Sequence, residues 1–341
     1  MIGNESIDLS LKNIWESWFA FRKGKKATDE LHNFQYYLEK NLYELFEDLN
    51  SGKYRHGNYR KFIVCDNKRR EISVANIRDR VVHRLVYDYL EKIYDKTFIY
   101  DAWSCRKGKG LLGAIERSAC FLKHYSTHTH THTHTAKPFF ACQAGTVGIW
   151  KCDVKKFFDS VDQEILLKIL SFRIKDSTTL NLLKEIIFSF TTVPERKIGM
   201  PIGNLTSQIF ANIYLNELDR FVKHELRAKA YLRYGDDFII VENDFEKLEI
   251  FRIKTTDFLK NKLKLTVNPK SDKILKPAHG LKFLGIKFWQ SGRTLSKRSL
   301  KRSTQRLNNA NISSYSGLIK KHCNKKYQKY FDWVVLEKLN F

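Results

Sequence analysis

Apolar positions along the chain follow two spacings, which predict a mixture of helices and strands. Apolar residues three and four positions apart predict amphipathic helices, because this spacing places them on one helix face. Helices are predicted in this way over residues 31–49, 76–94, 111–125, 209–222 and 245–263. Short branched or aromatic runs bounded by turn residues predict strands. Such runs cover residues 62–65, 71–74, 148–153 and 265–267.

The stretch 231–241 predicts the clearest strand pair. Its apolar and aromatic runs flank Gly235, Asp236 and Asp237 on both sides. Glycine followed by aspartate is typical of tight turns, so we expect a β-hairpin with two carboxylates at its tip. An ordinary surface turn has the same pattern. A third carboxylate elsewhere is needed to favour a functional site.

Asp153 supplies that third carboxylate, at the end of the predicted strand 148–153. An aromatic turn and a helix follow, and Ser160 with Gln163 is typical of a capping box. The order of elements predicts an α+β fold, in which an antiparallel sheet is backed by helices. We therefore expect Asp153 and the two hairpin carboxylates to meet at one sheet edge.

Three clustered carboxylates repel one another unless cations neutralise them. Two Mg²⁺ ions, or Mn²⁺ in their place, would do so and support nucleotidyl transfer to a 3′-hydroxyl. Arg70 and Arg106 lie in basic segments whose guanidinium groups suit a triphosphate. These features predict a template-directed polymerase with an antiparallel palm sheet and basic fingers.

Charge supports a polyanionic partner. The 341 residues include 61 Lys and Arg against 37 Asp and Glu, a formal net charge of +24 spread over the whole length. A merely soluble basic protein is the alternative, but an excess of this size favours nucleic acid.

The cysteines and the N-terminus predict a cytoplasmic protein. The six cysteines show no zinc-binding spacing and are expected to be buried free thiols; they are Cys65, Cys105, Cys120, Cys142, Cys152 and Cys323. The first residues do not form a signal peptide, and no apolar run is long enough to span a membrane.

Thr127–Thr135 alternates threonine and histidine strictly. The alternation would align four histidines, so adventitious Zn²⁺ or Ni²⁺ binding is one interpretation. A solvated low-complexity insertion is favoured, and we expect residues 126–148 to be poorly ordered.

Taken together, the motifs resemble those of bacterial reverse transcriptases in content and order. The matching segments are Arg69-Arg70 with 79–82, 104–110, 153–158, 201–208, 234–237 and 283–285. Residues 202–214 are most similar to enzymes of diversity-generating retroelements, and 314–317 with His322 resembles their thumb. Group II intron-like and antiphage-defence enzymes are further relatives.

The resemblance assigns expected roles at the catalytic centre. Asp153, Asp236 and Asp237 would hold the metals. Phe158 would be the steric gate that excludes a ribose 2′-hydroxyl and so favours dNTPs. Phe283-Leu284-Gly285 would be the primer grip.

Further roles concern the nucleotide. Arg70 and Arg106 would contact the triphosphate, and Gly203 would let the backbone approach the nascent base pair. Gln208, at the end of the 201–208 motif, is also expected to take part in nucleotide binding. Ile202 stands where many accurate relatives have glutamine. In the family, an apolar residue at this position is associated with error-prone, adenine-directed copying. Either Lys270 or Lys273 would act near the triphosphate.

The expected organisation is a right-hand polymerase with an N-terminal helical extension (1–60), fingers and palm (61–288) and a basic helical thumb (289–341). The expected function is RNA-directed synthesis of cDNA, error-prone and within a diversity-generating retroelement (mutagenic retrohoming). A stand-alone antiphage reverse transcriptase, an RNA-dependent RNA polymerase suggested by Gly235, and an inactive RNA-binding module are the alternatives. The expected partners are template RNA, nascent cDNA, dNTPs and a small basic accessory oligomer.

Overall fold

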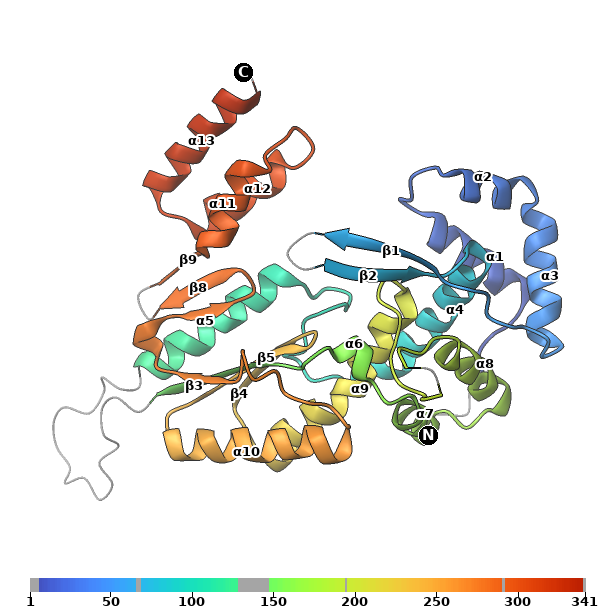
Figure 1. Cartoon of the computed structure of the whole chain (residues 1–341), viewed down its shortest axis with the longest axis horizontal. Helices are drawn as coiled ribbons and strands as arrows, with labels where there is room; N and C mark the ends of the chain where they lie inside the picture. The colour runs from blue at the N-terminus through green and yellow to red at the C-terminus, as the bar shows by residue number, and fades with distance from the viewer. Residues whose placement is uncertain (1–5, 66–68, 128–146, 194, 290–291, 340–341) are drawn as a thin grey trace. The chain divides into compact units, whose positions relative to one another are not determined.

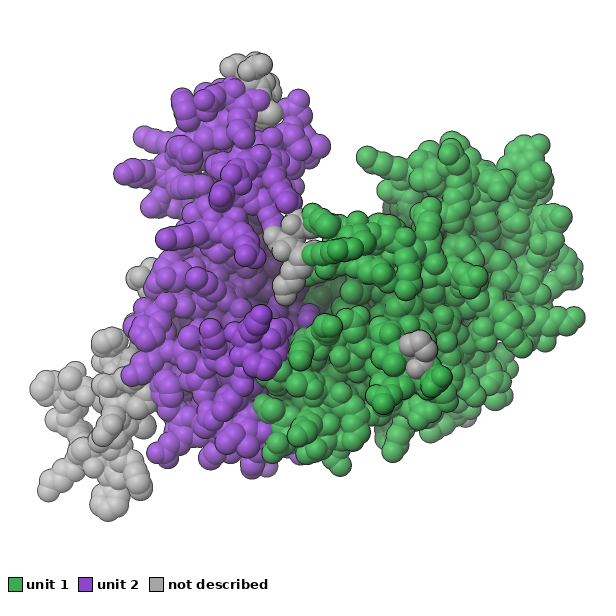
Figure 2. Space-filling view, in the orientation of Figure 1, with its two compact units in different colours: residues 1–106, 154–221, 255–267 green, residues 107–153, 222–254, 268–341 purple. Residues whose placement is uncertain are grey.

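The computed structural model describes residues 6–65, 69–127, 147–193, 195–289 and 292–339. The chain forms two compact units that interleave along the sequence, shown in green and purple in Figure 2. Unit 1 comprises residues 1–106, 154–221 and 255–267, and unit 2 comprises 107–153, 222–254 and 268–341. The Thr/His repeat expected to be poorly ordered lies almost wholly outside the described residues.

Unit 1 is largely helical (Figure 1). Its helices are α1 (Leu11–Arg22), α2 (Asp29–Tyr36), α3 (Leu38–Asn50), α4 (Ile77–Tyr94), α6 (Phe157–Ser160), α7 (Gln163–Arg173), α8 (Ser177–Phe188) and α9 (Leu205–Arg220), with a 3₁₀ turn at Asp95–Thr97. A π-helix at Phe221–Glu225 follows α9 and continues into unit 2. Helix α4 packs against α1 and α9. The predicted apolar stripe of α4 is buried, and the Asn76 side chain caps its first turn by accepting from the backbone N–H of Asp79.

The predicted helix over 31–49 is wrong in one respect: it is two helices, α2 and α3. The backbone leaves helical geometry at Tyr37, where φ is −108° and ψ is 31°. The Asn41 side-chain amide donates to the Phe34 carbonyl at 3.0 Å, satisfying a carbonyl at the end of α2. Leu31 and Leu42 are both buried, so the apolar stripe runs through the break and conceals it in the sequence.

The predicted capping box is also wrong. Helix α7 begins at Gln163, and its cap is Asp162, whose carboxylate accepts from the backbone N–H groups of Glu164 and Ile165. Ser160 instead ends the separate short helix α6. A carboxylate directly before the helix is an N-cap of the preferred kind and satisfies two otherwise unpaired donors.

Unit 1 also contains an antiparallel hairpin, β1 (Arg60–Cys65) with β2 (Arg69–Val74). Every residue of β1 is exposed. The predicted strand over 265–267 forms only an isolated bridge, between Val267 and Val154. Lys264 has a φ of +53°, so the chain turns just before this segment and leaves it too short for a ladder.

Unit 2 is organised around a four-stranded antiparallel sheet. Its strands are β3 (Gly148–Asp153), β4 (Ala230–Tyr234), β5 (Asp237–Glu242) and β6 (Lys273–Leu275), in the order β4-β5-β3-β6. Helices α5 (Leu111–Thr127) and α10 (Phe245–Lys262) pack against it (Figure 1). The core includes the rings of Trp150, Phe238 and Tyr231. The expected α+β fold with an antiparallel sheet and packed helices is confirmed.

The C-terminal part of unit 2 is a second sheet followed by helices. The sheet contains β7 (Leu281–Phe283), β8 (Ile286–Trp289) and β9 (Gly292–Leu295), preceded by a 3₁₀ turn at Pro277–His279. Helices α11 (Lys297–Gln305), α12 (Ile312–His322) and α13 (Lys325–Leu339) follow. The segment expected to be a helical thumb therefore starts with a strand.

Glu116 of α5 ties these elements to the rest of unit 2. Its carboxylate accepts a bidentate pair from Arg293 on β9, at 2.6 and 2.7 Å, and lies 3.3 Å from the Lys321 Nζ on α12. The hydrogen bonds from Arg293 lower the pKa of Glu116 to about 2. Glu116 is therefore ionised throughout the neutral range.

The expectation of buried thiols is wrong for three cysteines. Cys65, Cys105 and Cys120 are exposed, Cys323 is half-buried, and Cys152 is buried in β3; Cys142 lies outside the described residues. None of the helices described is both long and apolar enough to cross a bilayer.

Candidate active site

The acidic hairpin forms as the sequence predicts. Strands β4 and β5 pair with Tyr234 opposite Asp237, which leaves Gly235 and Asp236 as a two-residue turn. Gly235 has a φ of +66°, and Asp236 keeps a negative φ. A positive φ at the first turn position only is typical of a type II′ turn, where glycine is preferred. The turn therefore holds Asp236 directly beside the first residue of β5.

Asp153 lies directly opposite Asp237. The two are cross-strand partners in the antiparallel pairing of β3 with β5. Opposed residues in such a pairing have Cα atoms about 4.5–5.5 Å apart, and their side chains share one face of the sheet. The expected meeting of these two carboxylates at the sheet edge is confirmed.

Strand alternation gives the face on which the two acids lie. A Cβ on Gly148 would meet the side chain of Leu248 on α10, so Gly148 faces that helix. Successive side chains of a strand point to opposite faces. Asp153, five positions later, therefore lies on the face away from α10, together with Asp237.

Asn268 supports Asp153 and was missed by the sequence analysis. Its side-chain amide donates to the Asp153 carboxylate at 3.0 Å, and its backbone N–H donates to the Asp153 carbonyl at 2.9 Å. The Ser271 hydroxyl accepts from the Asp153 backbone N–H. Asn268 is followed by Pro269, and Asn-Pro is a turn signal that could have directed attention to this amide.

A fourth acid, Asp272, lies on the side of β3 that faces α10. It accepts from the Trp150 indole N–H at 2.7 Å and from Arg252 at 2.7 Å. The pKa of the Cys152 thiol is raised, first by burial and then by the negative charges of Asp272, Asp153 and Asp237. This end of β3 is therefore a region of negative potential, which favours cations.

The acids fit magnesium in their donor chemistry but do not form a closed cage. Among the described residues, no group of three His, Cys, Asp or Glu side chains is arranged to hold a metal. Mg²⁺ prefers oxygen ligands and is usually held by one or two carboxylates together with substrate phosphates. Asp153 and Asp237 match that mode, in which the substrate completes the metal site.

In unit 1, the expected nucleotide-side residues lie on two connected segments. The Phe158 carbonyl accepts from the Met200 N–H at 2.7 Å. The buried Gln163 amide donates to the carbonyls of Phe190 and Gly199, at 2.6 and 2.8 Å. Gln163, predicted as part of a helix cap, thus braces the loop that leads to Ile202.

The 202–204 segment docks on strand β2. The Ile202 carbonyl accepts from the Ser73 N–H at 3.0 Å, and the Asn204 amide bonds both the Ser73 carbonyl and the Ala75 N–H. Gly203 has a φ of +112°, and a Cβ there would lie 2.7 Å from Cγ2 of Ile72. Only glycine fits this position.

Arg70 lies on the same strand and the same face as Ile72, two positions earlier. Arg70 is exposed, and it has no ion-pair partner in the described part of the chain. The structure therefore brings Arg70, Ile202 and Gly203 to one strand of unit 1. Gln208 is exposed on the first turn of α9.

The two adjacent phenylalanines differ in environment. Phe157 is buried and its ring packs against that of Tyr214, with centroids 6.4 Å apart. Phe158 is only half-buried. Phe157 is thus a core residue, and Phe158 is the one available to a ligand.

Arg106 has partners that differ from the expected triphosphate. Its guanidinium pairs with Asp95 at 2.7 Å and donates to the carbonyls of Ile99 and Ala102. Its side chain is only 9% exposed. This geometry gives Arg106 a structural role in closing the 95–106 segment and does not support a role in nucleotide binding.

The expected primer grip is the turn between β7 and β8. Phe283 is buried, whereas Leu284 and Gly285 form the turn with φ values of +51° and +79°. Positive φ at both positions is typical of a type I′ turn. The Gly285 carbonyl accepts from the backbone N–H of Ser296 and the hydroxyl of Ser299, which fixes the turn to the start of α11.

Both candidate lysines are exposed on the segment that carries Asn268 and Asp272. Lys273 begins β6 and is the cross-strand partner of Lys151. Lys270 follows the turn at Asn268. The structure does not favour either lysine as the one near a triphosphate.

Comparison with known proteins identifies a family. A family model described as reverse transcriptase (RNA-dependent DNA polymerase) matches residues 56–288. Protein YkfC of Escherichia coli (strain K12) is 26% identical over 284 residues, covering 71% of this chain and 69% of YkfC. The group II intron-encoded protein LtrA of Lactococcus lactis subsp. cremoris is 23% identical over 343 residues, covering 79% of this chain and 53% of LtrA.

Solved structures show a likeness in fold. The telomerase of Candida albicans, solved with a fragment of telomeric RNA, superposes with a TM-score of 0.52 at 13% identity. The match covers 89% of this chain and 60% of the telomerase chain. The chain therefore spans only about half the length of LtrA and less than two thirds of the telomerase.

The geometry at Gly203 predicts that a methyl group added there lowers the stability of the fold, whereas one added at Gly317 does not. Gly203→Ala places Cβ against Ile72 at a φ that alanine rarely adopts, so we expect the free energy of unfolding to fall by about 1–3 kcal/mol. Gly317→Ala is the matched control, because Gly317 lies within α12 with open space around it and an ordinary φ. We expect it to be neutral or to stabilise by up to about 1 kcal/mol. Urea unfolding followed by tryptophan fluorescence measures both, and equal effects would contradict the docking of the 202–204 segment.

Proposed function

Because this chain belongs to the reverse transcriptase family, we propose that it copies RNA into DNA, with Asp153, Asp236 and Asp237 as its catalytic carboxylates. The observation that carries the proposal is the direct pairing of Asp153 with Asp237, next to Asp236 in a tight turn. Two like charges opposed across a sheet destabilise it. A cation between them removes that cost, which gives the arrangement a functional reason.

The reaction is nucleotidyl transfer. The 3′-hydroxyl oxygen of the primer attacks the α-phosphorus of a dNTP, a new phosphodiester bond forms, and pyrophosphate leaves. Two bound Mg²⁺ ions would acidify the hydroxyl and neutralise the leaving group. The protein contributes position: Asn268 orients one oxygen of Asp153 through its amide, and the type II′ turn fixes Asp236 beside Asp237.

The nucleotide-side roles follow from residues of unit 1. Arg70 is proposed to contact the triphosphate, because its guanidinium is exposed and matches phosphate oxygens in geometry. Gly203 presents backbone without a side chain, and its fixed φ keeps the backbone accessible. Phe158 is proposed as the gate against a ribose 2′-hydroxyl, which makes dNTPs the substrates.

We further propose error-prone copying within a diversity-generating retroelement. Ile202 supports this, because an apolar side chain cannot make the hydrogen bond that glutamine offers to a nascent base pair. Antiphage defence is the alternative role. The neighbouring DNA discriminates the two: a near-repeat of a variable gene that differs at adenines supports the retroelement, and its absence beside defence genes supports the alternative.

Substitution of Asp236 tests the catalytic proposal. We expect Asp236→Ala to slow extension of a DNA primer on an RNA template by at least about a hundredfold, because it removes a charge that acts on the transition state. Asp332→Ala removes an exposed carboxylate on α13 and should leave the rate unchanged. Extension with Mg²⁺ and dNTPs measures both, and activity retained by Asp236→Ala would reject the assignment.

Substitution of Phe158 tests sugar selection. We expect Phe158→Ala to lower the preference for dNTPs over rNTPs at least about tenfold, because the space of a 2′-hydroxyl is no longer filled. Phe172→Ala is the control, since Phe172 is 75% exposed on α7. The ratio of kcat/KM for dCTP and CTP is the readout. An unchanged ratio rules out the gate, and a wild-type preference for CTP would instead identify an RNA polymerase.

A further inference from the structure

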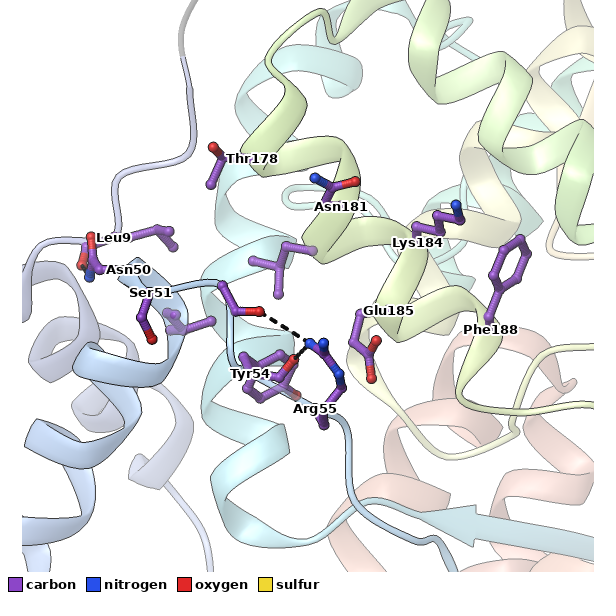
Figure 3. A pocket seen from close by; sticks show the side chains of 13 residues that line it. Leu9, Asn50, Ser51, Tyr54, Arg55, Thr178, Asn181, Lys184, Glu185 and Phe188 are labelled. Carbon is purple, nitrogen blue, oxygen red and sulfur yellow. Dashed lines mark hydrogen bonds between the residues drawn. The ribbon is translucent and has the colours of Figure 1, made fainter.

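Unit 1 contains a cavity whose lining includes none of the candidate catalytic or nucleotide-side residues. It has a volume of about 590 Å³, within the range of ligand sites. Helix α8 forms one wall, and the segment that follows α3 forms another (Figure 3). Its polar and aromatic lining includes Asn50, Arg55, Thr178, Asn181, Lys184 and Phe188.

Two cations line this cavity. Lys184 is exposed on α8 and makes no hydrogen bond or ion pair with the residues that the structure describes. Arg55 uses one guanidinium nitrogen, NH1, to donate to the carbonyls of Gly52 and Tyr54, at 3.2 and 2.7 Å. Its other two nitrogens remain available to an anion. The cavity therefore offers two positive groups to a phosphate-bearing ligand.

The other lining groups suit a nucleotide. Phe188 lies at one end of the cavity (Figure 3), with the Lys197 ammonium 4.7 Å from the centroid of its ring, so the other ring face is the one on which a base can stack. Thr178 and Asn181 lie on the exposed face of α8 and offer a hydroxyl and an amide. Such groups can bond the ribose 2′-hydroxyl, which distinguishes RNA from DNA.

One acid opposes the cations. Glu185 lines the same cavity, and its carboxylate accepts from the His56 backbone N–H at 3.0 Å. That hydrogen bond partly satisfies its charge. Lys184 and Arg55 outnumber it, and the net charge of the chain, +24, favours polyanions throughout.

We propose that this cavity binds a nucleotide of single-stranded RNA, with Lys184 and Arg55 on the phosphate and Phe188 against the base. It is a second RNA contact, separate from the three carboxylates. The proposal rests on the proposed function in one respect, because it takes the bound strand to be the template.

Equilibrium binding of an unstructured, fluorescein-labelled 30-nucleotide RNA to the full chain tests it. We expect Lys184→Gln to weaken binding about fivefold and to reduce the slope of log K against log salt by about 0.7, the value for one phosphate on a single strand. Phe188→Leu keeps an apolar side chain but removes the ring, and should weaken binding about fivefold. Lys168→Gln, on an exposed lysine of α7 outside the cavity, should change neither quantity.

Four measurements separate the outcomes. Thermal unfolding of Lys184→Gln should match the wild type, since Lys184 makes no hydrogen bond or ion pair with the described residues. Phe188→Leu loses the contact of its ring with Lys197, so its RNA affinity is measured below its own unfolding temperature. Extension of a short, fully paired primer–template by the wild type and by Lys168→Gln reports on the polymerase alone, so failure of both would overturn the proposed polymerase activity and not the RNA-binding cavity. RNA affinities of Lys184→Gln and Phe188→Leu equal to that of Lys168→Gln would overturn the cavity proposal. The same titration with a DNA strand of the same sequence tests the assignment to RNA. Variants that bind this DNA more weakly than the wild type, but bind RNA with unchanged affinity, would overturn it.

Discussion

The pairing of β3 with β5 is the constraint on which the candidate site depends. It places two carboxylates, Asp153 and Asp237, opposite each other at the end of a sheet whose interior is almost entirely buried. The two carboxylates repel each other, which destabilises this end of the sheet. The burial of Trp150, Phe238 and their neighbours stabilises the strands that hold the carboxylates together. The apolar sheet therefore holds an unfavourable charge arrangement that a divalent cation relieves.

The supporting residues act through hydrogen bonds to backbone and carboxylate. Asn268 holds Asp153 twice, once through its side chain and once through its backbone. In unit 1, Gln163 and Asn204 perform the equivalent task for the loop that contains Ile202 and Gly203. These amides are buried or half-buried, so each bond they make also satisfies a polar group that would otherwise be costly.

Much of the fold and the core of the site could be predicted from the sequence. The acidic hairpin and Asp153 were predictable because strand alternation and turn chemistry are local properties of the chain. The partners of Arg106 were not, because Asp95 reaches it through a turn with no charge pattern to mark it. The break at Tyr37 was hidden by an apolar stripe that continues across it, and Asn268 was hidden because its role depends on a strand more than a hundred residues away.

Localised oxidative cleavage tests the central claim that Asp153 and Asp237 form a cation seat. Fe²⁺ replaces Mg²⁺ at oxygen-ligand sites and, with ascorbate and peroxide, generates radicals that cut the nearby backbone. We expect fragments that end close to residues 153 and 236–237, suppressed by excess Mg²⁺ and lost in Asp153→Asn and Asp237→Asn. Cleavage elsewhere in the chain, or the same fragments in both variants, would contradict the account.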